Sequence, residues 1–172
     1  MPCQKCKTNA VYEFTNKAKL CKECFIDYFE RKIFRTIRKY QMGMLNIAGD
    51  KKDARYKIIK IISGKIKISR SPKAKAMTGI KNLNDFSAEI ISGVMNQRFD
   101  IKDFLPKAKN KEFPLYFMPD KEILLYAKLK RITGGIKRKE KKMQKEINLL
   151  FSEIEKSDRD ARHAVVNAVA KI

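Results

Sequence analysis

The residues with the clearest chemistry are four cysteines near the start of the chain. They form two Cys-x-x-Cys pairs, Cys3/Cys6 and Cys21/Cys24, and no other cysteine follows in the 172 residues. Each pair presents two sulfurs from one tight turn, and the residues between the pairs are expected to form a short hairpin that brings the pairs together. Four thiolates complete a tetrahedron and leave no open coordination position. The spacing therefore predicts a structural Zn²⁺ site, with an iron–sulfur cluster or a redox dithiol as the alternatives.

The charge of the chain is its second strong feature. There are 40 Lys and Arg residues against 19 Asp and Glu residues, which gives a formal net charge of +21. A surplus of this size normally has a polyanionic partner, and we expect structured RNA, with DNA or an anionic membrane surface as alternatives. Lys or Arg interrupts every apolar run, so neither a transmembrane span nor a signal peptide is expected. We expect a cytoplasmic protein whose thiols stay reduced.

The segment after the cysteines is amphipathic. Apolar residues recur every three to four positions from Phe25 to Tyr40, which predicts a helix within residues 25–45. No acidic residue lies between Glu30 and Asp50, so the basic face of this helix lacks following partners. The alternative to RNA contact is an ordinary solvated face. The cations predicted to contact RNA phosphates here are Arg31, Lys32, Arg35, Arg38 and Lys39.

A second basic segment holds ten Lys and Arg residues and one acid between Lys51 and Lys75. Its sequence KIIKIISGKIKIS alternates Lys with Ile and is predicted to form a two-stranded β-ribbon that turns at Ser-Gly. The following SRSPKAK is expected to be an extended arm. An amphipathic hairpin that uses Lys for solubility is the alternative. The predicted RNA contacts are Lys57, Lys60, Lys65, Lys67, Arg70, Lys73 and Lys75.

A third basic segment holds nine Lys and Arg residues and one acid between Lys128 and Lys145. It forms the loop before a helix whose core stripe is expected at Met143, Ile147, Leu150 and Ile154. Cations in the first turn of a helix oppose its dipole unless an external anion binds there. The predicted RNA contacts are Lys130, Arg131, Lys137, Arg138, Lys139, Lys141 and Lys142.

Three stretches, in order, carry a resemblance to a known family. They are LCKECFIDYFERKIFRTIRKY, TGIKNLNDFSAEIISGVMNQ and FPLYFMPDKEILLYAKLKRI, and the closing FSEIEKSDRDARHAVVNAVAKI is a weaker match. Together they resemble the tRNA 2-thiolation ATP-pyrophosphatase family over about two thirds of the chain. The resemblance implies an α/β domain that follows an N-terminal zinc finger, and an ancestor that bound tRNA.

The chain departs from that family where its chemistry resides. The family's SGGKDS-type loop, which cradles pyrophosphate through backbone N–H groups, is represented by Ser63-Gly64-Lys65 alone. Further cysteines for sulfur transfer and for a second zinc finger are absent. Asn84 and Asp85, in the place of the family's LDD-type segment, are expected to cap a helix that begins near Phe86. The lone His163 is interpreted as structural or surface-exposed.

These observations predict an α+β, mainly α-helical fold, the remnant of an α/β ATP-pyrophosphatase domain. We expect a four-cysteine zinc finger at 1–24, a basic helix at 25–45, a reduced α/β remnant with the β-ribbon at 46–132, and a basic loop with C-terminal helices at 133–172. The predicted function is that of a pseudoenzyme: a non-catalytic, zinc-containing RNA-binding protein that contacts ribosomal RNA, either as a ribosomal protein or as a ribosome-associated one. A tRNA-binding accessory subunit of a thiolation complex is the alternative, and a minimal ATP-dependent tRNA-modifying enzyme is the third hypothesis.

Overall fold

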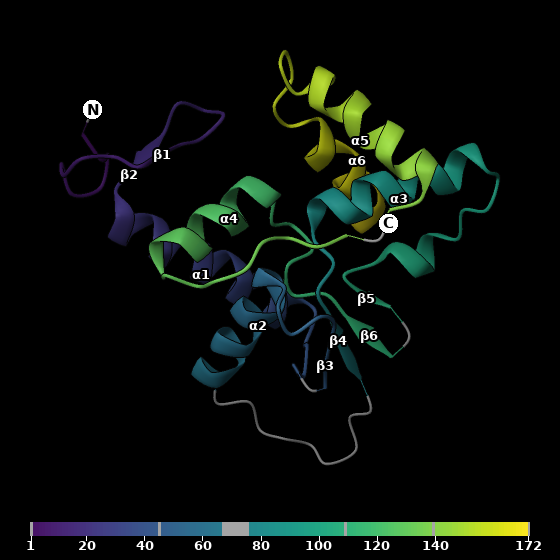
Figure 1. Ribbon diagram of the computed structural model, residues 1–172, viewed down its shortest axis with the longest axis horizontal. Helices are drawn as coiled ribbons and strands as arrows, with labels where there is room; N and C mark the ends of the chain where they lie inside the picture. The colour runs from purple at the N-terminus through teal and green to yellow at the C-terminus, as the bar shows by residue number, and fades with distance from the viewer. Residues whose placement is uncertain (1, 45, 67–75, 109, 139, 172) are drawn as a thin grey trace.

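The computed structural model describes residues 2–44, 46–66, 76–108, 110–138 and 140–171. The N-terminal hairpin lies at one end of the molecule (Figure 1). The helices and strands are β1 (Tyr12–Glu13), β2 (Lys19–Leu20), α1 (Lys22–Lys39), β3 (Ile47–Ala48), α2 (Ala54–Lys65), β4 (Met77–Gly79), α3 (Leu83–Met95), the 3₁₀ turn η1 (Ile101–Phe104), β5 (Lys107–Ala108), β6 (Lys111–Glu112), α4 (Asp120–Leu129), α5 (Lys142–Ile154) and α6 (Ala161–Ala170).

The N-terminal hairpin continues directly into the long helix α1. Strands β1 and β2 pair antiparallel, and α1 then buries Phe25, Phe29, Ile33 and Ile37 along one face, as the periodicity predicts. The ring of Phe29 stacks on Tyr126 of α4 with a centroid distance of 4.2 Å. The apolar face of α1 therefore packs on α4, which fixes the direction of the opposite, basic face.

A four-stranded sheet has the order β3-β4-β6-β5. Strands β3, β4 and β6 run parallel, and β5 pairs antiparallel with β6. Because β3 and β4 are parallel neighbours, the loops that follow them meet at the same edge of the sheet. Helices α2 and α3 begin at this edge, in the arrangement where α/β proteins commonly bind ligands.

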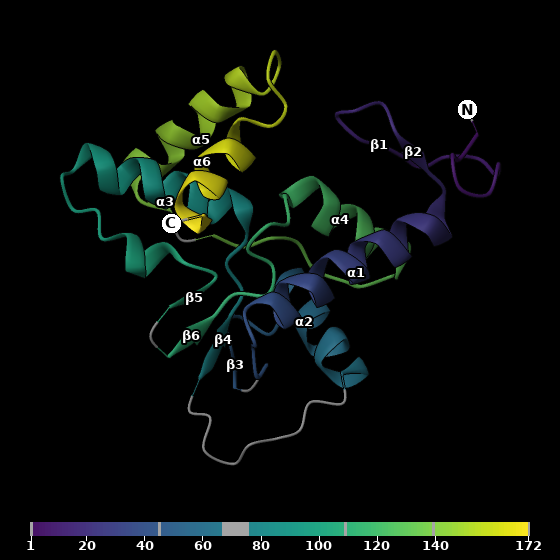
Figure 2. The ribbon, with the colours of Figure 1, turned by 180° about the vertical axis from the view of Figure 1, so that it is seen from behind.

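The helices form two groups, seen from opposite sides in Figures 1 and 2. Helices α1, α2 and α4 share one core, which buries Ile58, Ile62 and Leu115 completely. Helix α3 packs on α6 and on α5 in the second group, where Phe86 and Val166 are buried. No helix in the described ranges is both long and apolar enough to cross a membrane.

The predicted fold class is confirmed. The protein is an α+β, mainly helical fold with four clustered cysteines at the N-terminus, a long basic helix, a small sheet and C-terminal helices. The position of the β-ribbon within residues 57–66 is wrong, because α2 occupies Ala54–Lys65. The repeat K-I-I-K-I-I has a period of three rather than two, and it buries Ile58, Ile59 and Ile62 on one helical face. The second half of the predicted ribbon lies outside the described residues.

The predicted core stripe of α5 is also partly wrong. Ile147 is buried as expected, but its partner is Phe151, one turn later. Leu150 is 57% exposed and Ile154 is 39% exposed. Helix α5 lies on the outside of its group, where one narrow face packs against α3 and α6. Leu149 and Leu150 lie beside this face and remain exposed.

Candidate functional site

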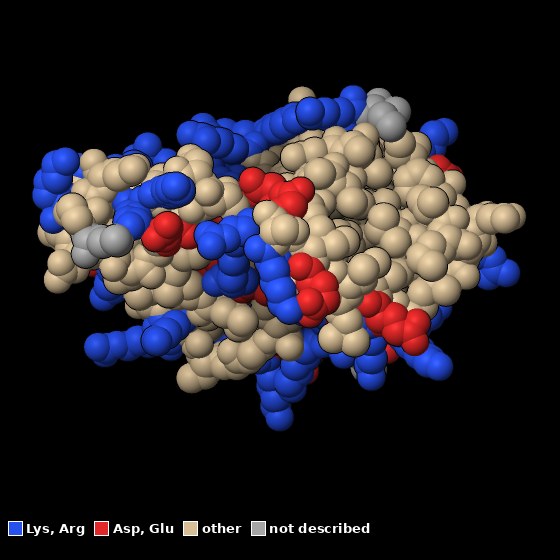
Figure 3. All heavy atoms as spheres, turned by 90° about the horizontal axis from the view of Figure 1, so that it is seen from above, with Lys and Arg blue, Asp and Glu red and all other residues tan. Residues whose placement is uncertain are grey.

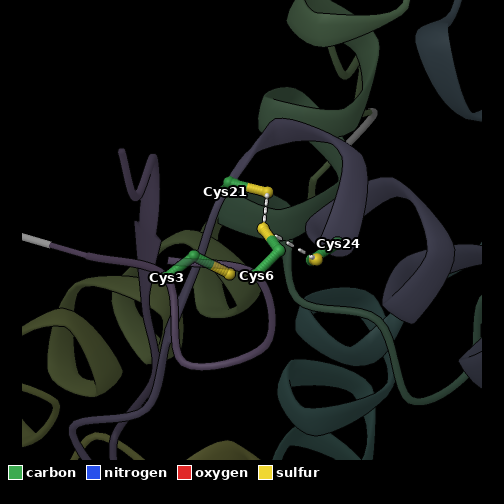
Figure 4. A group of neighbouring side chains, drawn as sticks. All are labelled: Cys3, Cys6, Cys21 and Cys24. Atoms are coloured by element: carbon green, nitrogen blue, oxygen red, sulfur yellow. Dashed lines mark hydrogen bonds between the residues drawn. The ribbon is translucent and has the colours of Figure 1, made fainter. Parts of the chain in front are cut away.

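The four cysteines meet where the N-terminal hairpin joins α1 (Figure 4). Their Sγ atoms all lie within 4.8 Å of one another. The sulfur of Cys6 is 3.4 Å from that of Cys21 and 3.7 Å from that of Cys24. Thiolates bound at about 2.3 Å to one tetrahedral ion lie about 3.8 Å apart, so the cluster has the dimensions of a site for a single metal ion.

The surroundings of the cluster shift the thiols in opposite directions, because burial and the neighbouring thiols raise the pKa of Cys24 to about 12. Hydrogen bonds from the Thr8 hydroxyl and the backbone N–H of Cys24 lower the pKa of Cys21 to about 6. Cys3 and Cys21 are buried, whereas Cys6 is exposed. An ion bound here is therefore held against the hairpin on one side and lies near solvent on the other, as in a metal site that stabilises a small lobe.

A second candidate site lies at the edge where β3 and β4 end. The loop Gly49–Asp53 joins β3 to α2, and residues 80–82 join β4 to α3. Helix N-termini at such an edge often bind phosphate. Here protein carboxylates take that place, because Asp53 accepts the N–H of Arg55 at 2.8 Å and Asp85 accepts the N–H of Asn82 at 3.0 Å.

The capping role predicted for Asn84 and Asp85 divides between two helices. Helix α3 begins at Leu83 rather than near Phe86; its N-cap is Asn82, and Asp85 at the third helical position accepts the N–H of Asn82. Asn84 Oδ1 instead accepts the N–H of Asp120 at 3.0 Å, at the start of α4. The two side chains thus tie the first turns of α3 and α4 together.

Two arginine side chains fill the edge between these loops. Arg55 is 3% exposed, and its guanidinium lies 2.8 Å from Asp53 and 2.6 Å from Asp85. Arg138 also pairs with Asp85, and it donates to Asp120 at 2.8 Å. Burial alone lowers the pKa of Arg138, but the two carboxylates raise it, so the arginine stays charged. The cavity that remains at this edge has a volume of about 210 Å³.

The loop that carries Arg138 is held against the start of α2 by a glycine. Gly134 has φ +111°, and a Cβ there would lie 2.3 Å from the carbonyl oxygen of Lys52. We expect Gly134→Ala to lower the free energy of unfolding by about 1–3 kcal/mol, measured by urea denaturation. Gly135→Ala is the matched control, because a Cβ there meets nothing within 4 Å, and we expect a change below about 0.5 kcal/mol. Equal effects of the two variants would contradict this account of the loop.

The predicted remnant of the ATP loop does not lie at the strand edge. Ser63-Gly64-Lys65 forms the last turn of α2, and the Lys65 ammonium pairs with Glu30 at 2.6 Å. Backbone N–H groups inside a helix are already bonded and do not cradle a phosphate. The loop that follows the first strand of the four-stranded sheet is Gly49–Asp53, which shares no residue with the predicted remnant.

The predicted RNA contacts on α1 differ in how their charges are balanced. Arg31 pairs at 2.7 Å with Asp27, which lies one turn earlier in the same helix. Lys32 pairs at 3.2 Å with Glu122 of α4. Burial raises the pKa of Glu122. The remaining three are exposed, and within the described part of the chain none has a carboxylate within 4.0 Å; they are Arg35, Arg38 and Lys39.

The predicted contacts in the other two basic segments are dispersed. Lys57 donates to the carbonyl of Thr133 at 2.6 Å, Lys137 pairs with Asp50 at 3.1 Å, and Arg138 is held in the carboxylate network. Those exposed and without an ion pair among the described residues are Lys60, Lys130, Arg131, Lys141 and Lys142. Those outside the described residues are Lys67, Arg70, Lys73, Lys75 and Lys139.

A cavity of about 640 Å³ lies along the basic face of α1, and the sequence interpretation missed it. Cations of α1 line one side, and Phe117 and His163 line the other. Burial and the nearby charge of Lys32 lower the pKa of His163 to about 4, so its imidazole is neutral at pH 7. Because these residues are far apart in the chain, no local pattern brings them together.

Comparison with known proteins finds a match in structure rather than in sequence. No family model matches the chain, and no curated protein does. A solved structure, "U34-tRNA thiolase NcsA from Methanococcus maripaludis with its [4Fe-4S] cluster", superposes with a TM-score of 0.78 and 14% sequence identity, over 98% of this chain and 86% of that chain. The chain has the fold of this thiolase. At this identity the likeness establishes the fold, and it agrees with the family resemblance of the three sequence stretches.

Proposed function

We propose that this protein is a zinc-containing RNA-binding protein that performs no ATP-dependent chemistry. One contrast carries the proposal. At the strand edge, where the fold offers a place for a nucleotide, Arg55 and Arg138 are consumed in ion pairs with Asp53, Asp85 and Asp120. On the surface, by contrast, many cations of the described residues have no carboxylate within 4.0 Å, among them Arg35, Arg38 and Lys60.

The surface charge supports a polyanionic partner. In the face shown in Figure 3, Lys and Arg side chains extend along much of the outline, while Asp and Glu form a few separate groups. The formal net charge of +21 is repulsive within a folded monomer unless anions bind. RNA is the polyanion that the fold favours, because the thiolase of the same fold is by its description a tRNA enzyme.

Zinc is the metal that best fits the cysteine cluster. Sulfur–sulfur distances within 4.8 Å suit four thiolates around one ion. In a four-iron cluster each thiolate binds a different iron, so the sulfurs lie farther apart. The [4Fe-4S] cluster in the description of the thiolase is that protein's, and the compact group at Cys3, Cys6, Cys21 and Cys24 supports a structural zinc site here.

The RNA-binding proposal predicts strong salt dependence. Each phosphate contact contributes about −0.7 to −0.9 to the slope of log affinity against log salt concentration, so several contacts give a steep line. Fluorescence anisotropy with a labelled structured RNA, at a series of salt concentrations, measures the slope. An affinity that barely changes between low and high salt would contradict binding through distributed Lys and Arg.

Crosslinking in the native cells, followed by sequencing of the attached RNA, identifies the RNA class. We expect most of the crosslinked RNA to be ribosomal RNA and the crosslinks to lie at one locus of it. The reason is that positive charge is spread over α1, α2 and the 130–142 loop. Isothermal titration with ATP and Mg²⁺ is the companion measurement, and we expect no binding, because Arg55 and Arg138 fill the strand edge. Saturable ATP binding at micromolar concentration would overturn the non-catalytic part of the proposal.

A second candidate function, a tRNA-binding accessory subunit of a thiolation complex, is favoured by one observation. Such a subunit needs an apolar surface for its partner, and α5 exposes 67% of Leu149 and 57% of Leu150. The right half of Figure 3 shows a broad area without charged side chains, which offers room for a protein partner. Crosslinks to tRNA in place of ribosomal RNA would favour this candidate over a ribosomal role.

A further inference from the structure

The cavity along α1, called here the α1 groove, combines features that suit a nucleotide. Its volume is about 640 Å³, and it is lined in part by Arg35, Arg38, Lys39, Phe117 and His163. No residue that lines it is acidic. Helix α1 lies toward the viewer in Figure 2, and its side chains Arg35, Arg38 and Lys39 are exposed.

Four cations line the groove; Lys32 pairs with Glu122 at 3.2 Å, and the other three are free to bind phosphate. Arg35 and Lys39 lie one helical turn apart, about 6 Å along the axis, and Arg38 lies between them. All three are exposed, and across the described ranges no carboxylate lies within 4.0 Å of them. Arg38 donates to the carbonyl of Phe34 at 3.4 Å, and the Lys39 ammonium lies 5.2 Å from the ring centre of Tyr40. Neither contact neutralises a charge.

The opposite wall offers an aromatic surface. Phe117 is half-buried, and its ring is held by edge contact with Tyr116 at 4.8 Å and by Tyr40 at 6.4 Å between centroids. A fixed aromatic ring is a stacking platform for an unpaired base. The neutral imidazole of His163 lies on the same wall and adds no charge at pH 7. The acidic residues on the other side of His163 line two neighbouring cavities rather than the groove; they are Glu122, Asp160, Asp120 and Glu155.

We propose that the α1 groove binds an unstacked nucleotide of single-stranded RNA, with its phosphates on Arg35, Arg38 and Lys39 and its base against Phe117. A double helix keeps its bases stacked, so a duplex contacts the cations and leaves the aromatic wall empty. The groove therefore gives the protein a preference for a loop or an unpaired strand. This inference rests on the proposed RNA-binding function and specifies where the unpaired segment lies.

The test compares two labelled RNAs, a short single strand and a hairpin of fully paired stem, with the full-length, zinc-loaded protein. We expect Phe117→Leu to weaken single-strand binding roughly tenfold, since stacking contributes about 1–3 kcal/mol per base, and to leave stem binding nearly unchanged. Phe117→Tyr keeps an aromatic ring and should retain the affinity. Phe99→Leu is the matched control, because Phe99 stacks on Phe104 away from the groove.

The phosphate contacts are tested by charge removal. A double variant, Arg35→Gln with Arg38→Gln, should lower the salt slope for the single strand by about 1.4, that is, about 0.7 for each lost contact. Lys102→Gln with Lys111→Gln removes the same charge from exposed positions outside the groove and should leave the slope unchanged. Thermal unfolding verifies that each variant is folded.

The outcomes separate the groove from the broader proposal. If the wild-type protein binds both RNAs and the groove variants bind them with the same affinity, the proposed nucleotide site in the α1 groove is overturned, while the proposed RNA binding is not. If the wild-type protein binds neither RNA, the proposed function fails and the groove with it. Weakened single-strand binding in Phe117→Leu, restored in Phe117→Tyr, supports the inference.

Discussion

Removing the metal, or replacing Cys24 with Ser, is expected to unfold residues 2–24 while α3, α5 and α6 keep their structure. The N-terminal lobe has little core of its own, because Cys3, Leu20 and Cys21 are its buried apolar residues in the described part. Structural zinc in comparable small lobes supplies an apparent binding free energy of about 10–16 kcal/mol, more than such a hairpin can replace. Amide hydrogen exchange, compared with and without a chelator, measures the change segment by segment.

The effect should reach α1 but decline along it. The ring of Phe25 packs on the ring of Tyr12 in the hairpin, with 4.9 Å between their centroids. The ring of Phe29, one turn later, stacks on Tyr126 of α4 instead. The first turn of α1 therefore loses support with the metal, and the following turns keep theirs from α4. Gln4→Ala is a control, since Gln4 is exposed in the same turn and supplies no sulfur. Metal analysis should find one zinc per chain; iron with inorganic sulfide, or unchanged exchange after chelation, would contradict the assignment.

The clustering of the four cysteines and the buried face of α1 were predictable because their information is local. A Cys-x-x-Cys turn fixes two sulfurs within a few residues, and a period of 3.6 residues fixes which side of α1 is buried. Both features depend on residues that are close in the sequence, so they form in the same way however the remainder of the chain folds. The apolar stripe Phe25, Phe29, Ile33 and Ile37 is accordingly buried as expected.

The strand edge was not predictable to the same extent. The sequence GDKKDA after a short apolar segment carries a weak signal, a glycine followed by an N-cap aspartate, and the longer, more regular KIIKII repeat obscured it. Arg138 pairs with Asp85, which is 53 residues away, and no spacing rule reports such a contact. For the same reason Phe117 and His163 gave no sign that they share a cavity with α1.

The carboxylate–arginine network at the strand edge leads to the second large prediction. Arg55→Ala is expected to lower the free energy of unfolding by about 3–5 kcal/mol, because it leaves a buried charge without its partner. Asp53 is fully buried and Arg55 is 3% exposed, so water cannot replace the lost ion pair without opening the fold. Urea denaturation at pH 7 measures the loss. Lys52→Ala, on the exposed part of the same loop, is the matched control and should change stability by less than about 0.5 kcal/mol.

The pH dependence of this loss distinguishes an unpaired charge from lost packing. Burial alone raises the pKa of Asp53, but Arg55 and two backbone N–H groups lower it below its usual value. The wild-type protein therefore loses stability as the pH falls, because the unfolded chain binds the proton more readily. Without the guanidinium of Arg55, the pKa of Asp53 rises from its wild-type value, so the variant loses less stability than the wild type as the pH falls. We expect the deficit to shrink between about pH 5 and pH 3, where carboxylates take up protons. A deficit that stays constant over this range, as for a simple cavity, would show that packing rather than charge holds this edge of the sheet.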